Sequence, residues 1–169
     1  MASRSEGPLL AYRIVRSGYP AFDGAGAARH GGRWSSRGRF VIHAAESYAL
    51  AILENLVHFN IGELPPSQVV VQMRIPASVS RERVVAAQLP GWDRPYPNGV
   101  SQEFGDRWYD ELRSAVLIVP STLSPYETNI LINQRHREAT QIGIGPENVN
   151  RRPRLTTFRR PTLTMLLRC

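Results

Sequence analysis

The chain has 169 residues, 42% hydrophobic and 8% aromatic, an ordinary balance for one globular domain with a proper core. It has no apolar run long enough for a membrane helix, and its first eight residues lack the apolar region of a secretory signal, so we expect a cytoplasmic protein. The single cysteine is Cys169, which disfavours disulfides, a cysteine metal site and a buried catalytic thiol.

The net charge is +7, and the chain contains no lysine, so its 21 basic residues are all arginine. A positive charge of this size is typical of proteins that bind nucleic acid. The arginines are spread along the sequence rather than gathered on one predicted helix, which makes direct nucleic-acid binding the less favoured interpretation. The same charge would equally suit an acidic partner protein.

The first predicted strand is Leu10–Val15, with Arg13 on one side and Tyr12 and Ile14 on the other. An arginine in mid-strand either faces water or faces a ligand. Residues 24–39 then form a loop in which four arginines alternate with glycines: Arg29, Arg33, Arg37 and Arg39.

Glycine lets a backbone approach a ligand closely, and the guanidinium fork matches phosphate with two parallel hydrogen bonds. The loop therefore suits an anionic ligand such as a dinucleotide. It is not a Rossmann fingerprint, because Gly24-Ala-Gly26 follows no clear strand, and the absence of lysine excludes a Walker loop.

A short strand, Phe40–His43, leads to a helix that begins near Ser47. Its apolar residues recur at three- and four-residue spacing and predict a core-facing stripe that includes Leu50, Leu53 and Val57. Glu54 lies on or beside that stripe, where a carboxylate is costly unless it is paired. Three interpretations stay open: the Glu54 carboxylate faces water, it pairs with an arginine, or it points into a cleft.

The second half of the chain predicts further strands and one helix. Val69–Ile75 is nearly all apolar, which predicts a central strand. The composition of Pro76–Gly105 predicts a long irregular loop. The other predicted elements are a helix over Glu103–Ser114 and strands over Ala115–Val119, Asn129–Asn133 and Gln141–Ile144. Ser121 follows the end of a predicted strand, and a serine in that place is most often a turn or helix-cap residue. The four histidines lack ligand spacing, so no metal site is expected.

Taken in order, these residues resemble the RES domain family, named for its Arg, Glu and Ser. The resemblance runs from about Leu10 to Leu155, which implies a single domain over residues 1–155 and a basic tail over 156–169. The matching motifs are Tyr12-Arg13-Ile14, Gly31-Gly32-Arg33-Trp34, Glu46-Ser47 with Leu53-Glu54, Val119-Pro120-Ser121, and Glu127-x-Asn129-x-Leu131-x-Asn133-x-x-His136.

The resemblance implies an α+β fold similar to the ADP-ribosyltransferase toxins, a mixed β core with flanking helices. RES proteins are toxins of bacterial toxin–antitoxin modules, and an Xre-like antitoxin partner is expected to block the NAD cleft. They consume NAD as a substrate and need no metal. The ADP-ribose acceptor, whether a protein target, phosphate or water, stays open, and a basic RNA-directed toxin or a non-enzymatic nucleic-acid-binding module is the alternative.

By position, the resemblance implies five site residues. Glu54 is the expected catalytic carboxylate, and Ser121, also expected at the catalytic centre, is a polar partner in the pocket. Arg13 and Arg33 are expected to bind the NAD phosphates and ribose. His43 stands where the family usually has tyrosine, so a ring can still stack on the substrate, but this position supplies no phenol hydroxyl.

Overall fold

A computed structural model of the protein describes residues 7–59, 68–95 and 99–144; the predicted tail 156–169 and the boundary near residue 155 lie outside these ranges. The described residues form an α+β fold, as expected, with one mixed sheet in the order β4-β5-β6-β2-β1-β3-β7. The strands are β1 (Leu9–Arg16), β2 (Val41–Ala45), β3 (Gln68–Ile75), β4 (Arg81–Arg83), β5 (Val116–Pro120), β6 (Thr128–Asn133) and β7 (Gly143–Ile144). The helices are α1 (Ala25–His30), α2 (Tyr48–Phe59) and α3 (Gly99–Asp110), with short 3-10 turns η1 (Ala86–Gln88) and η2 (Arg137–Gln141).

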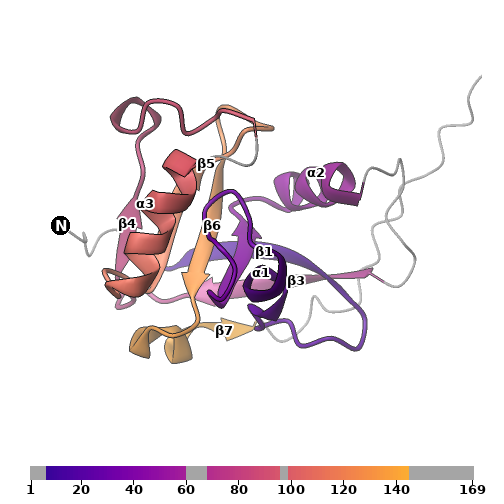
Figure 1. Ribbon diagram of the computed structural model, residues 1–169. Helices are drawn as coiled ribbons and strands as arrows, with labels where there is room; N and C mark the ends of the chain where they lie inside the picture. Colours follow the sequence, from indigo (N-terminus) through magenta and orange to yellow (C-terminus); the bar gives the residue numbers. More distant parts are fainter. Residues whose placement is uncertain (1–6, 60–67, 96–98, 145–169) are drawn as a thin grey trace, which may run out of the picture.

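The sheet is almost divided into two parts at its centre. Neighbouring strands are antiparallel except for the parallel pair β4–β5. β1 and β2 share a single register pair, Tyr12 opposite Ala45, whereas β1 pairs with β3 along its whole length. In Figure 1, β1 and β3 accordingly run in a different direction from β5 and β6.

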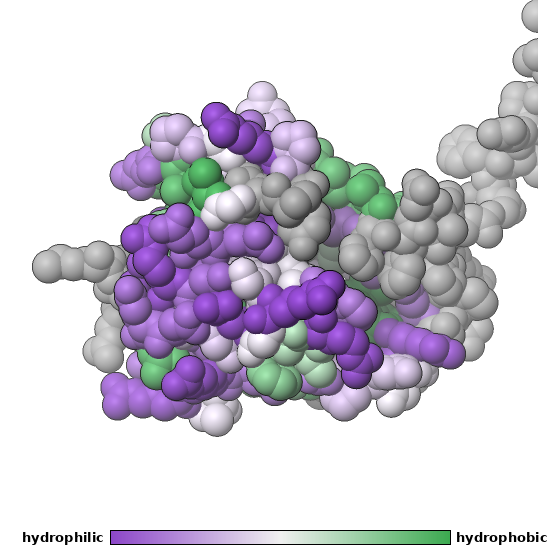
Figure 2. Space-filling view, viewed as in Figure 1, coloured by the Kyte–Doolittle hydropathy of each residue, from purple (hydrophilic) through white to green (hydrophobic). Residues whose placement is uncertain are grey.

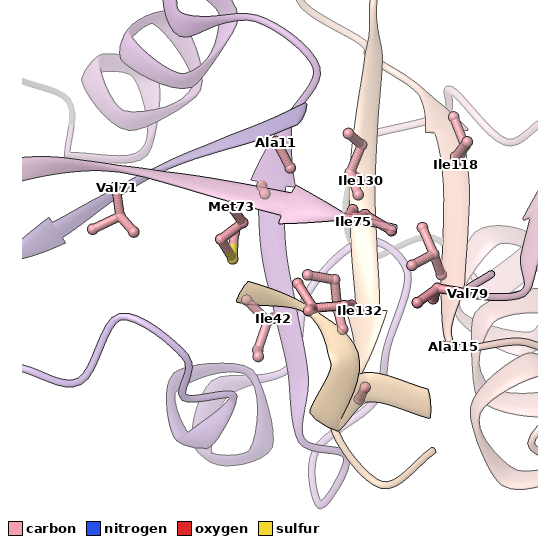
Figure 3. Packing of buried hydrophobic residues seen from close by; sticks show 14 of the residues in the cluster. Ala11, Ile42, Val71, Met73, Ile75, Val79, Ala115, Ile118, Ile130 and Ile132 are labelled. Carbon is pink, nitrogen blue, oxygen red and sulfur yellow. The ribbon is translucent and has the colours of Figure 1, made fainter. Parts of the chain in front are cut away.

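Residues that lie opposite each other in the sheet share a face, and alternate residues share a face along each strand. One face, here called the core face, carries Ile42 and Ala44 of β2 and Ile130 and Ile132 of β6, and it contributes to the largest hydrophobic cluster. Figure 3 shows this cluster with residues from β1, β2, β3, β5 and β6. The core face therefore supplies most of the packing that holds the two parts of the sheet together.

The opposite face, here called the helical face, carries Val41, His43 and Ala45 of β2 and Asn129, Leu131 and Asn133 of β6. α3 packs on it through Trp108 and Tyr109, which cluster with Val41 and Leu131. α2 packs on it through Leu50 and Ala51, which cluster with Ala45. In Figure 1, α2 and α3 lie on opposite sides of β6, so a strip of the helical face runs between them.

Most predicted strands are confirmed within two residues at each end, and the differences have local causes. β3 is not central, because it lies between β1 and the two-residue strand β7; β2 occupies the centre. α3 begins and ends earlier than predicted: Leu112 has a positive φ of 52° just beyond its end, and Ser114 accepts a hydrogen bond from the Trp108 indole.

The sequence prediction missed two short elements and overextended a third. β4 has the sequence Arg-Glu-Arg, with no apolar alternation, and it forms by parallel pairing with β5. α1 lies within the segment predicted as a loop and buries none of its residues completely. Gln141 belongs to the turn η2, so the last strand is only Gly143–Ile144.

The prediction that α2 buries Leu53 and Val57 is wrong. Leu50 is buried, but Leu53 is 39% and Val57 54% exposed. Figure 2 shows a hydrophobic patch of surface at the position of α2. The helix therefore turns part of its apolar surface outward and brings Glu54 toward the sheet.

No helix among the described residues is long and apolar enough to cross a bilayer.

We expect Gly105→Ala in α3 to destabilise the fold strongly. A Cβ at position 105 would lie 1.8 Å from the Trp34 carbonyl oxygen, a backbone atom that cannot move aside cheaply. Such overpacking costs about 2–3 kcal/mol, which lowers the thermal midpoint of a chain of this size by roughly 5–10 °C. Gly99→Ala in the same helix, with open space around it, is the control. Equal melting temperatures for both variants would contradict the close approach of α3 to the Trp34 backbone.

Candidate active site

The start of β6 fixes the start of α2. Ser47 caps the helix: its Oγ accepts the backbone N–H of Leu50 at 3.0 Å, and its carbonyl accepts that of Ala51. The same hydroxyl donates to Glu127, and hydrogen bonds from Ser47 and Ser124 lower the pKa of the Glu127 carboxyl. One residue further along, Thr128 donates its hydroxyl to the Glu46 carboxylate. The entry of α2 is therefore held by polar contacts to β6.

Glu54 lies roughly two turns beyond Ser47, partly buried against the helical face. Its Oε1 accepts a hydrogen bond from Asn129 Nδ2 at 2.6 Å and another from Ser121 Oγ at 3.0 Å. No described residue hydrogen-bonds to its Oε2. Of the three interpretations left open by the sequence, an arginine pair is excluded among the described residues, because two neutral donors hold the carboxylate. A carboxylate held at one oxygen keeps the other available for a ligand.

Ser121 is 3% exposed and joins a turn to the carboxylate. Its Oγ accepts the backbone N–H groups of Leu123 at 3.1 Å and Ser124 at 3.3 Å. Because these two bonds occupy the hydroxyl lone pairs, its hydrogen is directed at Glu54. Ser121 is thus the turn residue that the sequence pattern favoured, and it also contacts Glu54, while its catalytic role stays a prediction.

His43 lies between Glu54 and the glycine-rich loop. It is exposed on the helical face, roughly 7 Å along β2 from Ala45, which is paired with Asn129. A Cβ built on Gly32 would come within 3.5 Å of His43 Cε1, so the loop backbone lies directly beside the ring. A side-chain Cβ at this position would make an ordinary van der Waals contact with the imidazole.

Arg33 follows in the same loop, which α3 and the segment 89–95 hold in place. The indole of Trp34 stacks on that of Trp92 with ring centroids 6.2 Å apart, and Gln102 donates to the Gly32 carbonyl at 3.0 Å. One guanidinium nitrogen of Arg33, Nη1, donates to the carbonyls of Trp92 at 3.2 Å and Arg94 at 2.7 Å. Nε and Nη2 have no hydrogen-bond partner among the described residues. The guanidinium is thus oriented while two of its nitrogens keep donors for a ligand.

Arg13 is not brought together with these residues. Tyr12 pairs with Ala45 and so lies on the helical face, which places Arg13 on the core face. Its Nη1 donates to the Ala21 carbonyl at 3.0 Å; burial lowers its pKa, and nearby Asp23 opposes that shift. This geometry makes Arg13 a brace between β1 and the segment that follows it, and it does not favour the expected contact with NAD.

Asn129 is the site residue that the sequence reasoning did not assign. A signal was present: Asn129, Leu131 and Asn133 alternate along β6 and share the helical face, and Glu127 continues the same alternation just before the strand. Leu131 is buried in the core beneath α3, and Asn133 donates to the Tyr109 carbonyl at 3.0 Å. Only the position of α2 reveals that Asn129, among these four, reaches Glu54.

The candidate site lies on a strip of the helical face. An open depression of about 460 Å³, lined by Arg37, Arg39, Phe40, Tyr109 and Arg135 among others, lies at the other end of β2 and β6 and does not include Glu54. The candidate site is the set of hydrogen-bonded side chains around Glu54. Within the described ranges, no group of three or more His, Cys, Asp or Glu is placed to hold a metal ion.

Comparisons with known proteins agree on one family. The RES domain model matches residues 10–152. The Prs ADP-ribosylating toxin of Sphingobium sp. (strain YBL2) is 44% identical over 122 residues, which cover 70% of this chain and 76% of that protein. Toxin Res of Photorhabdus laumondii is 35% identical over 127 residues, covering 74% and 81%. A chain of the M. tuberculosis MbcT–MbcA toxin–antitoxin complex has a TM-score of 0.65 at 15% identity, covering 83% of each chain, and supports the fold.

Proposed function

The chain belongs to the RES domain family, and from that premise we propose that it is a toxin enzyme that breaks the nicotinamide–ribose bond of NAD and passes ADP-ribose to an acceptor. The observation that carries this proposal is the Glu54 carboxylate, fixed by Ser121 and Asn129 through Oε1 alone. His43 is on the helical face, and Arg33 follows Gly32, whose backbone lies beside the His43 ring.

Glu54 acts on the charge that develops at the ribose. Nicotinamide leaves NAD as a neutral molecule from a cationic ring, so the leaving group needs no proton and one carboxylate is enough. The transition state resembles an oxocarbenium ion, as in glycoside cleavage. The Oε2 atom of Glu54, unpartnered among the described residues, would stabilise that cation or orient a ribose hydroxyl. Preorganised charge of this kind is usually the largest catalytic contribution.

Arg33 binds the pyrophosphate in this proposal. Its Nη1 is already fixed by two carbonyls, so Nε and Nη2 would meet a phosphate without much loss of side-chain freedom. Phosphate binding remote from the reacting carbon positions that carbon against Glu54. His43 would pack on the nicotinamide or the ribose, and Arg13 would support β1 from the core face.

An antitoxin is the expected partner, and a protein is the favoured acceptor. The fold neighbour comes from a toxin–antitoxin complex, which supports a partner protein; we propose an Xre-like antitoxin that covers the NAD-binding strip. The name of the Sphingobium relative, an ADP-ribosylating toxin, supports transfer to a protein over transfer to phosphate or water.

The test is to incubate the purified chain with labelled NAD, with and without bacterial lysate, and to follow both free nicotinamide and label on protein. Nicotinamide release with a labelled protein band identifies a protein-modifying transferase. Release without a band identifies a hydrolase, or a phosphorylase if added phosphate accelerates it. No release in either condition contradicts the proposed reaction.

We expect His43→Tyr to be tolerated. The phenol ring keeps an aromatic face beside Gly32, where the imidazole now lies, and ring stacking tolerates this exchange. The kcat/KM for NAD should stay within about threefold of the wild type, since a loss below about 1 kcal/mol is less than tenfold. His43→Ala, which removes the ring, is the comparison. Equal losses in both variants would show that an imidazole nitrogen matters and that stacking alone does not explain position 43.

A further inference from the structure

We propose that Asn129 is the positioning residue of this site: it holds Glu54 so that one carboxylate oxygen is fixed and the other faces the substrate. This inference rests on the proposed function and extends it. The contact is short, 2.6 Å from Asn129 Nδ2 to Glu54 Oε1, and it crosses from the central part of the sheet to a helix far away in sequence.

Packing alone does not fix α2 with the precision that a catalytic carboxylate needs. Among the α2 side chains that the structure describes, Leu50 and Ala51 are the two in a buried hydrophobic cluster, whereas Leu53 and Val57 face outward. Polar contacts from three consecutive residues of the β6 region compensate: Glu127 holds Ser47, Thr128 holds Glu46, and Asn129 holds Glu54. Of these three residues, Asn129 is the one that contacts the Glu54 carboxylate.

The chemistry of the amide suits this task. Ser121 donates a single hydrogen bond to Oε1, which leaves the carboxylate free to rotate about that contact. A second donor on the same oxygen removes this freedom without adding charge, so the negative charge of Glu54 stays available to the developing cation. A cation in place of Asn129 would neutralise it, and an anion would repel it.

Asn129→Asp is the decisive variant, because it keeps the shape but replaces the donor with a second carboxylate. At pH 8 both carboxylates are ionised and repel, so kcat for nicotinamide release should fall about 100-fold, the order of effect that a misplaced catalytic group produces. Neighbouring carboxylates bind one shared proton more readily than a lone carboxylate does, so lowering the pH to 5.5 returns a hydrogen-bond donor between the two side chains in part of the population. The ratio of variant to wild-type kcat should therefore rise by about tenfold or more between pH 8 and pH 5.5, with KM for NAD within about threefold of wild type at both values.

Thr128→Val is the matched control. It removes the hydrogen bond to Glu46 from the neighbouring residue of β6 without touching Glu54, so its kcat ratio to wild type should be the same at both pH values. Glu46 and Glu127, the other carboxylates at the start of α2, and His43, the imidazole on the same face of β2, are present in the wild type and in every variant compared. Thermal melts at both pH values check folding. If the Asp variant fails to fold, Asn129→Ser, whose hydroxyl is too short to reach Oε1, should lower kcat about tenfold without pH-dependent recovery.

The outcomes separate the two proposals. An active wild type whose Asp variant shows a pH-independent ratio, or whose Ser variant keeps full kcat, overturns the role of Asn129 and leaves the proposed function standing. A wild type that releases no nicotinamide overturns both, since Asn129 would then have no reaction to support. Recovery of the Asp variant at low pH supports the inference, because a residue needed only for folding would give no such recovery.

Discussion

Glu54→Gln is expected to abolish NAD consumption while leaving the fold intact. Removing one preorganised electrostatic group costs about 100- to 1,000-fold in kcat, and Glu54 is the only carboxylate in the proposed mechanism. The amide keeps an oxygen that accepts from Ser121 and Asn129, so the hydrogen bonds that hold the side chain survive. What disappears is the negative charge opposite the developing oxocarbenium ion.

The measurement is single-turnover nicotinamide release at saturating NAD, with a thermal melt of each variant. Glu103→Gln is the matched control, because Glu103 is exposed on α3 and its carboxylate forms no hydrogen bond or ion pair with a described residue. The control should keep wild-type turnover, and both variants should melt within a few degrees of the wild type. Wild-type turnover in Glu54→Gln would remove Glu54 from the chemistry.

Arg33→Ala is expected to weaken NAD binding about 10- to 100-fold, since hydrogen bonds to charged groups contribute about 1.5–3 kcal/mol each. The loss should appear chiefly in the dissociation constant and in KM, because the pyrophosphate lies away from the bond that breaks. Arg33→Lys should recover only part of the affinity, because an ammonium lacks the planar set of donors of a guanidinium. A lysine cannot hold the Trp92 and Arg94 carbonyls and also donate two parallel hydrogen bonds to a phosphate.

Titration of the Glu54→Gln background with NAD measures this affinity without turnover. Arg37→Ala is the control: Arg37 is an exposed arginine of the same loop, has the same charge and lines the separate depression near Phe40. Native affinity in Arg33→Ala, or an equal loss in Arg37→Ala, would contradict a specific contact between Arg33 and the pyrophosphate and would leave only the general positive charge of the loop.

The sequence predicted the parts of the site that depend on local pattern. Ser47 at the start of α2 and the alternation from Glu127 to Asn133 follow from helix capping and from the two-residue period of strands. The glycines beside Arg33 likewise indicated a loop whose backbone approaches another group, and Gly32 lies against His43. For each of these features, the physical cause lies within a few residues of the chain.

The tertiary structure decided which way the side chains face. Alternation puts Arg13 and Tyr12 on opposite sides of β1, but only the pairing of Tyr12 with Ala45 assigns Tyr12 to the helical face and Arg13 to the core face. The apolar spacing of α2 likewise left the rotation of the helix open, and polar contacts from β6 turned Glu54 inward and Val57 outward. Asn129 became a partner of Glu54 for the same reason: register and helix rotation depend on contacts between residues far apart in sequence, and periodicity within one element cannot specify them.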